Sequence, residues 1–358
     1  MNRFSWRGFD RELLAASLGL AIISAVVMVS AAEKINPQLA LRHGMWLVVG
    51  LLACVSVAQT NYRSWTQFAG IAYGISLIVL LLVPLLGSMR LGATRWLSIF
   101  GLSFQPAELA KLTSVWLLAQ YLAGQATPLP ARVLWTSLAL VAPPALLIFL
   151  QPDLGTSTVL VAIWLGIVWV AGIPSRLLLG LGLAALAAAP VAWHLLKDYQ
   201  KDRLMVFINP HADPLGAGYT IIQSTIAIGS GRVLGRGWFS GTQNQLSFLP
   251  ERHSDFIFSV LGEEWGFLGC LAVAALFAVL LLRAAQIALQ TSAPQGRLLA
   301  AGIFSWIGYQ AFINMGMVMG LLPVVGVPLP FLSYGGSSMV MLWIALGLLH
   351  SIRRTDLT

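Results

Sequence analysis

Ten apolar runs, most of them close to 20 residues long, constrain this chain more than any other feature of its sequence. A helix needs about 20 mostly apolar residues to cross the hydrocarbon core of a bilayer. Hydrophobic residues make up 58% of the chain and charged residues only 9%, against roughly 25% charged residues in a soluble domain. We therefore predict an all-α polytopic membrane protein, a single domain over residues 1–358, with about ten transmembrane helices at 13–32, 44–59, 67–87, 107–124, 133–150, 155–172, 175–195, 256–283, 298–320 and 334–351.

The distribution of arginines predicts how these helices are oriented. With ten spans both chain ends lie on one side, which carries many arginines but only Asp10, Glu12 and Asp356 as acids. The positive-inside rule makes that side cytoplasmic. Because residues 133–195 are apolar almost throughout, an error of one span there would invert the second half. The arginines are Arg3, Arg7, Arg11, Arg63, Arg132, Arg176, Arg283, Arg297, Arg353 and Arg354.

The longest polar segment, residues 196–254, connects predicted helices 7 and 8 and is rich in glycine. The predicted topology places this large loop on the extracytoplasmic face. Long loops of this kind are usually functional. Within it we expect an amphipathic helix around residues 219–228 that lies along the membrane surface before the glycines interrupt it.

Composition and motifs exclude several kinds of site. The net charge is +8 at pH 7, but the basic residues lie in short segments between apolar runs, where they meet membrane lipids rather than nucleic acid. The five histidines form no HExxH pair, and "GSGRVLGRG" lacks the Gly-Lys-Ser/Thr ending of a phosphate-binding loop. Cys54 and Cys270 lie inside apolar runs, without the spacing of a disulfide framework or a zinc site.

The stretch "LPERHSDFIFSVLGEEWGF" concentrates charge at the start of predicted helix 8. One interpretation makes Asp255 the N-cap of that helix. The other makes it a general base, because a carboxylate beside Phe256 and Phe258 has a raised proton affinity. Glu263 and Glu264 follow about two turns later, and each needs a partner or a cavity at that depth.

Three further groups have the residue types of a site for an anionic substrate. Glu108 and Lys111 project from one face of a helix that enters the membrane, either for function or as an ion pair that locks two helices. Asp153, in "QPDLGTS", is either an N-cap or a site carboxylate. Arg95 and Arg203 are candidate counter-charges for a lipid diphosphate, the alternative being contact with ordinary headgroups.

The chain resembles the SEDS family, whose branches include RodA, FtsW and SpoVE, and it is most similar to the RodA branch. The resemblance covers nearly the full length, and several long motifs recur in order. They are "RWLSIFGLSFQPAELAKL", "QPDLGTS", the stretch from Asp202 to Gly269 that contains "LPERHSDFIF", and "GLLPVVGVPLPFLSYGGSS".

The resemblance implies a peptidoglycan glycosyltransferase that polymerises lipid II during cell elongation. It implies that the protein lies in the bacterial cytoplasmic membrane, with both termini cytoplasmic and the active site outside, beside a class B penicillin-binding protein. It makes Asp255 the catalytic residue. The residues that we predict to bind substrate or to support the site are Glu108, Lys111, Asp153, Arg95, Arg203, Gln243, Glu263 and Glu264.

On this mapping Asp255 deprotonates the acceptor sugar 4-hydroxyl, which displaces undecaprenyl diphosphate with inversion. Arg203, Arg95 or Lys111 would hold the diphosphate; alternatively a divalent cation, Mg²⁺ or Mn²⁺, would do so, although no sequence pattern specifies it. A lipid II flippase is the leading alternative function, because buried charges also line translocation paths. A passive scaffold for the penicillin-binding protein is a third.

Overall fold

The computed structural model describes residues 9–90, 93–99, 102–126, 129–196, 198–216 and 218–356, so Arg3 and Arg7 lie outside the described residues. Each of the ten predicted spans is a helix, within a few residues at most ends. The ten helices are α1 (Arg11–Ala32), α2 (Gln38–Gln59), α4 (Ala69–Leu86), α5 (Pro106–Ala123), α6 (Ala131–Leu150), α7 (Leu154–Val170), α8 (Ser175–Leu195), α12 (Ile257–Gln290), α13 (Pro294–Val318) and α14 (Gly336–Asp356).

The prediction of a multi-pass membrane protein is confirmed. Seven of the ten helices are long and apolar enough to cross a membrane, counting only the described residues. Helix α7 and most of α8 are apolar but shorter. Helix α5 is not among the seven, and it carries the buried charges of Glu108 and Lys111.

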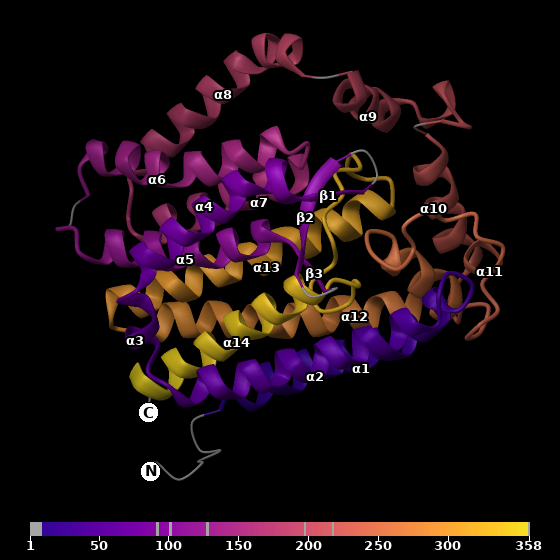
Figure 1. Ribbon diagram of the computed structural model, residues 1–358, viewed down its shortest axis with the longest axis horizontal. Helices are drawn as coiled ribbons and strands as arrows, with labels where there is room; N and C mark the ends of the chain where they lie inside the picture. The colour runs from indigo at the N-terminus through magenta and orange to yellow at the C-terminus, as the bar shows by residue number, and fades with distance from the viewer. Residues whose placement is uncertain are drawn as a thin grey trace.

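The long helices run side by side, and α13 lies in their middle (Figure 1). It packs against α5, α7 and α12, while α2 packs along α14 and α1 along α12. The start of α1 and the end of α14 lie close together at the lower left of the view, and the loop elements gather at the opposite end of the bundle. We refer to these as the termini end and the loop end.

The 196–254 segment at the loop end contains short helices, as expected for its middle part. They are α9 (Asp198–Ile208), the 3₁₀ turn η2 (Pro210–Ala212), α10 (Tyr219–Ser230) and α11 (Thr242–Gln245). The predicted amphipathic helix is α10, but it packs on α12 with Ile221, Ser224 and Ala227 buried. The Ser224 hydroxyl contacts the Ser259 hydroxyl at 2.7 Å, so α10 is fastened to protein rather than lying only on a membrane surface.

A small sheet at the loop end was not predicted. Strands β1 (Ser88–Arg90), β2 (Ala93–Ile99) and β3 (Leu102–Phe104) form an antiparallel sheet in the order β1-β2-β3. Strand β3 leads through Gln105 directly into α5, and β2 carries Arg95. The sheet therefore positions two of the segments that sequence analysis singled out.

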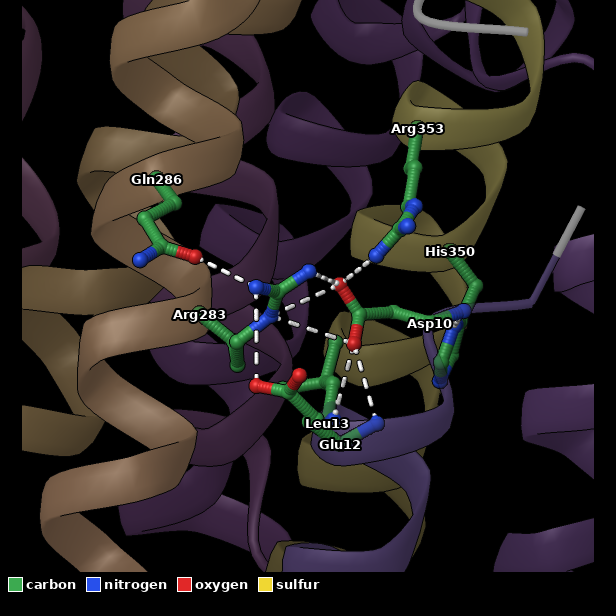
Figure 2. Close-up of polar contacts among 7 residues, drawn as sticks. All are labelled: Asp10, Glu12, Leu13, Arg283, Gln286, His350 and Arg353. Carbon is green, nitrogen blue, oxygen red and sulfur yellow. Dashed lines mark hydrogen bonds and ion pairs between the residues drawn. The ribbon is translucent and has the colours of Figure 1, made fainter.

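The termini end is held by a buried carboxylate, Asp10, which joins three helices (Figure 2). It caps α1 by accepting hydrogen bonds from the N–H groups of Glu12 and Leu13. Its carboxylate also accepts from Arg283 of α12, at 2.7 Å from Nη2, and from Arg353 of α14. Burial alone would raise the pKa of Asp10, but the hydrogen bonds from Arg283 and Leu13 and the charges of both arginines hold the pKa below its usual value.

We predict that Asp10→Asn lowers the free energy of unfolding by about 1–3 kcal/mol, because both arginines lose their charged acceptor. Since the pKa of Asp10 is lowered on folding, its stabilisation is present at neutral pH and is lost as the pH falls through the folded-state pKa. Thermal unfolding in detergent at pH 7 measures the difference. Glu12→Gln is the control, because that side chain is 68% exposed and is expected to change stability little; an equal effect of both variants would contradict the prediction.

Candidate active site

Asp255 lies just before α12, at the loop end, but it does not cap that helix. The N-cap is Phe256, and no side chain makes a capping hydrogen bond there. The capping interpretation of Asp255 is therefore wrong. No hydrogen bond to its carboxylate is found among the described residues, although the group is more than half-buried.

The backbone around Asp255 is held by two other segments. The side-chain amide of Asn314, fully buried on α13, donates to the Asp255 carbonyl oxygen at 2.8 Å and to that of Val327 at 2.7 Å. The Ser333 hydroxyl donates to the Ser254 carbonyl oxygen at 2.7 Å, and the Tyr334 N–H donates to the His253 carbonyl oxygen at 2.9 Å. These bonds fix the backbone and make no use of the carboxylate.

The sequence patterns do not predict a role for Asn314, Ser333 or Tyr334. Ser333 and Tyr334 lie in the matched motif "GLLPVVGVPLPFLSYGGSS", but nothing in its pattern says which segment it contacts. A role for Asn314 could still have been predicted from the sequence, since a lone amide inside an apolar helix needs a hydrogen-bond partner within the protein.

Gly326 brings the 326–334 segment directly against the Asp255 carboxylate. A Cβ atom at this position would lie 3.3 Å from Asp255 Oδ2. Its φ of +70° is also a conformation that favours glycine. On this side the Asp255 carboxylate is therefore bordered by backbone rather than by a side chain, which allows the 326–334 segment to lie close to it.

Burial is the main reason that the pKa of Asp255 is raised to about 7, and the negative charges of Glu251 and Asp153 raise it further. The positive charges of Arg203 and Arg95 act in the opposite direction. Three other predicted site residues, Asp153, Arg203 and Arg95, thus lie close enough for their charges to affect the pKa of Asp255. A carboxyl group of this kind is half-ionised near neutral pH, as a general base requires.

Asp153 caps α7, as one of the two interpretations predicted. Its carboxylate accepts from the Thr156 N–H at 3.1 Å and from the Gln105 side-chain amide at 3.3 Å. The Arg95 guanidinium donates from Nε to the Gln151 carbonyl oxygen at 3.1 Å and also to the carbonyl oxygen of the next residue, a proline. The turn before α7 therefore holds a carboxylate and a guanidinium together.

Arg203 reaches this neighbourhood from a different part of the chain. It lies on α9, within the 196–254 segment, and its side chain is exposed. Its positive charge nevertheless lowers the pKa of Asp255. The two arginines near Asp255 thus come from the sheet and from the large loop.

Glu108 and Lys111 form a buried ion pair within α5. Lys111 Nζ lies 2.8 Å from Glu108 Oε1, and both side chains are at most 1% exposed. The ammonium group also lies 3.5 Å from Gln310 Oε1 and over the ring of Trp306, both on α13. This geometry is that of an ion pair that locks α5 against α13. It is the second of the two alternatives that the sequence left open for Glu108 and Lys111.

Glu263 and Glu264 point into the protein and find partners there. The Glu263 carboxylate accepts from the N–H groups of Gln243, at 2.8 Å, and Asn244, at 3.2 Å. Glu264 accepts from the Ser30 hydroxyl and the Asn244 side-chain amide. Gln243 thus contributes its backbone, while its side-chain oxygen is buried without a partner in the described part of the chain.

Among the described residues, no group of three or more His, Cys, Asp and Glu side chains converges. This part of the chain therefore offers no complete set of ligands for a resident metal ion. Mg²⁺ is often held by one or two carboxylates together with substrate phosphates. The carboxylates around Asp255 fit only that arrangement, in which the cation arrives with the substrate.

Comparisons with known proteins identify close relatives over nearly the whole chain. The family model FTSW_RODA_SPOVE, described as "Cell cycle protein", matches residues 10–357. Peptidoglycan glycosyltransferase MrdB of Escherichia coli (strain K12) is 41% identical over 345 residues, 96% of this chain and 93% of MrdB. A solved chain from a peptidoglycan synthase complex, studied for the structural coordination of polymerization and crosslinking, has a TM-score of 0.84 at 35% identity and 98% coverage of both chains. The crystal structure of the rod shape determining protein RodA of Thermus thermophilus has a TM-score of 0.74 at 31% identity and 99% coverage of both.

Gly326→Ala is expected to reduce the catalytic activity that depends on Asp255 about tenfold or more. The added methyl group crowds Asp255 Oδ2 and strains the backbone at position 326. The matched control is Gly172→Ala at the far end of α7, which has a φ of +90° but no atom within 4 Å of the new Cβ. The control carries the backbone strain alone. Equal loss of activity in both purified variants would contradict the crowding of Asp255.

Lys111→Met is predicted to destabilise the protein by about 3–5 kcal/mol, because Glu108 is left buried without a counter-charge. The double variant Glu108→Gln/Lys111→Met should recover most of that loss. Thermal unfolding measures the stability of both. A double variant no more stable than Lys111→Met would argue against the lock, and one that is stable but inactive would assign the pair to substrate.

Proposed function

Because this chain belongs to the FtsW/RodA/SpoVE family, we propose that it is a peptidoglycan glycosyltransferase that polymerises lipid II, with Asp255 as its general base. The single observation that carries the proposal is the Asp255 carboxylate. It is positioned through its backbone, free of hydrogen bonds from the described residues, and has a pKa raised to about 7 beside two arginines. The name of the relative MrdB, a peptidoglycan glycosyltransferase, supports the same conclusion.

The reaction needs one proton transfer and one displacement. Asp255 accepts the proton of the acceptor sugar 4-hydroxyl as that oxygen attacks the anomeric carbon of the donor. The bond from the anomeric carbon to the diphosphate oxygen breaks, its electron pair leaves with undecaprenyl diphosphate, and the configuration inverts. The new glycosidic bond replaces the broken one, so no further reactant is required.

Charge on the departing diphosphate has to be stabilised on the side opposite to the base. Arg203 and Arg95 supply positive charge close to Asp255, and a guanidinium can bind phosphate oxygens through two parallel hydrogen bonds. Lys111 is less suited, because its ammonium is buried against Glu108 and Gln310. A divalent cation bound with the substrate would share this role.

Transport of lipid II without polymerisation is not favoured. The buried charges that suggested a translocation path are engaged within the bundle: Glu108 with Lys111, and Glu264 with Ser30 and Asn244. The relative MrdB is named as a peptidoglycan glycosyltransferase, and FtsW of Geobacter metallireducens, 36% identical over 361 residues, is named as a probable one.

The proposed setting is the bacterial cytoplasmic membrane, with the termini end in the cytoplasm and the loop end outside. The arginines at the termini end, including Arg283 and Arg353, support this orientation. A class B penicillin-binding protein is the proposed partner, since a solved relative belongs to a complex that couples polymerization to crosslinking.

Polymerisation of lipid II by the purified protein should rise with pH between about 6 and 8, because Asp255 must lose its proton to act as a base and its pKa is raised to about 7. Asp255→Asn keeps the shape of the side chain but cannot accept the proton, so activity should fall at least about 100-fold at every pH. Glycan length on gels measures both effects.

The control is Asp213→Asn, which removes an exposed carboxylate from the same loop and should keep the wild-type pH profile. A wild-type rate that does not vary over this pH range, or full activity of Asp255→Asn, would refute the role of Asp255 as base. Movement of labelled lipid II across liposomes without chain growth would support the flippase instead.

A further inference from the structure

A cluster of buried polar side chains lies where the end of α1, the start of α12 and the 231–256 loop meet. Ser30, Asn244, Arg252 and Glu264 are each at most 1% exposed. None of them is needed to bind or react with substrate in the mechanism above. The hydrogen bonds among these side chains join three segments, although Asn244 Oδ1 and Glu264 Oε2 have no partner among the described residues. Hydrogen bonds in such a buried network hold its segments in one arrangement.

Asn244 is the residue that joins the members of this cluster. Its side-chain Nδ2 donates to Glu264 Oε1 and to the Ser30 hydroxyl, both at 3.1 Å. The Ser30 hydroxyl in turn donates to the same Glu264 oxygen at 2.5 Å. The Asn244 side chain therefore ties α11 to both α12 and α1.

The main chain of Asn244 contacts the segment that leads to the catalytic residue. Its carbonyl oxygen accepts from Arg252 Nη1, and its N–H donates to Glu263 Oε2 at 3.2 Å. Arg252 also donates from Nε to the Ala31 carbonyl oxygen at 3.1 Å. Arg252 is three residues before Asp255, so this contact fixes the start of the segment whose end is held by Asn314.

Asn244 is a hydrogen-bond partner shared by the two charged side chains of the cluster. The Arg252 guanidinium and the Glu264 carboxylate are both buried, yet among the described residues each bonds to other groups and not to the other. Each instead bonds to a different part of Asn244. Burying such groups apart is costly, so the contacts that Asn244 makes with both of them matter, and a change at Asn244 is expected to affect both.

We propose that Asn244 is a positioning residue for the catalytic base: through Glu264 and Ser30 on one side and Arg252 on the other, it holds the 252–255 segment in place. The inference rests on the proposed glycosyltransferase function. It assigns Asn244 no contact with substrate, so its loss should lower kcat and leave KM for lipid II almost unchanged.

An exchange of the amide and the acid tests this directly. Asn244→Asp and Glu264→Gln each preserve the shape of the side chain. Asn244→Asp replaces the donor to Glu264 with a carboxylate, whereas Glu264→Gln keeps an acceptor for Asn244. In the double variant the amide introduced at position 264 can donate to the carboxylate introduced at position 244, which restores the bond with its direction reversed.

The expected result is a kcat about 10- to 100-fold lower for Asn244→Asp, a small change for Glu264→Gln, and recovery to within about threefold of wild type in the double variant. The matched control is Asn36→Asp with Glu33→Gln, the same chemical changes at exposed positions in the α1–α2 turn. Both control variants and their combination should behave as wild type. Thermal unfolding of every variant separates lost positioning from lost folding.

Wild-type activity for Asn244→Asp, or an equal loss in Asn244→Asp and the double variant, would overturn the proposal. A raised KM with kcat unchanged would also overturn it, because it would place Asn244 in substrate binding. If Asn244→Asp does not fold, an active double variant still supports the pairing, and an inactive but folded one refutes it. A wild-type protein without polymerase activity would instead refute the proposed function.

Discussion

Polar groups buried between these helices must find partners inside the protein, because the hydrocarbon of a bilayer offers none. The structure meets this requirement at three depths. Asp10 pairs with Arg283 and Arg353 at the termini end, Glu108 pairs with Lys111 near α13, and Glu264 bonds to Asn244 toward the loop end. Each contact joins segments that are distant in sequence or locks neighbouring helices, so the polar groups set the register of an otherwise apolar bundle.

Asp255 departs from that rule, and the departure is what makes it reactive. Its backbone is bonded to Asn314, but its carboxylate has no hydrogen-bond partner among the described residues, and burial raises its pKa to about 7. A carboxylate saturated with donors would remain ionised but would be a weak base. The protein therefore uses its hydrogen bonds to position the residue and leaves its proton-accepting oxygens open.

Local patterns in the sequence were predictive, whereas contacts between distant segments were not. Ten apolar runs became ten helices, and the motifs around Asp153 and Asp255 converged because both stand at helix starts of the loop end. The short strands between residues 88 and 104 have no such periodicity. The partner of Glu264 could not be predicted because Ser30 lies 234 residues away. The capping interpretation of Asp255 failed because the first turn of α12 begins one residue later than its pattern suggested.

The glycine-rich part of the loop also has a structural explanation. Helix α12 is interrupted at Gly266, where φ is +65°, so carbonyl groups near the break lose their helical donors. The loop supplies replacements: the N–H groups of Arg236 and Gly237 donate to the carbonyl oxygens of Glu263 and Glu264, each at 3.0 Å. A Cβ at Gly235 would lie 2.1 Å from the Glu264 carbonyl oxygen, so only glycine permits this approach. The glycines thus let the loop backbone complete a broken helix, and the same approach brings α11 within reach of Glu263 and Glu264, where Asn244 completes the cluster that supports Asp255.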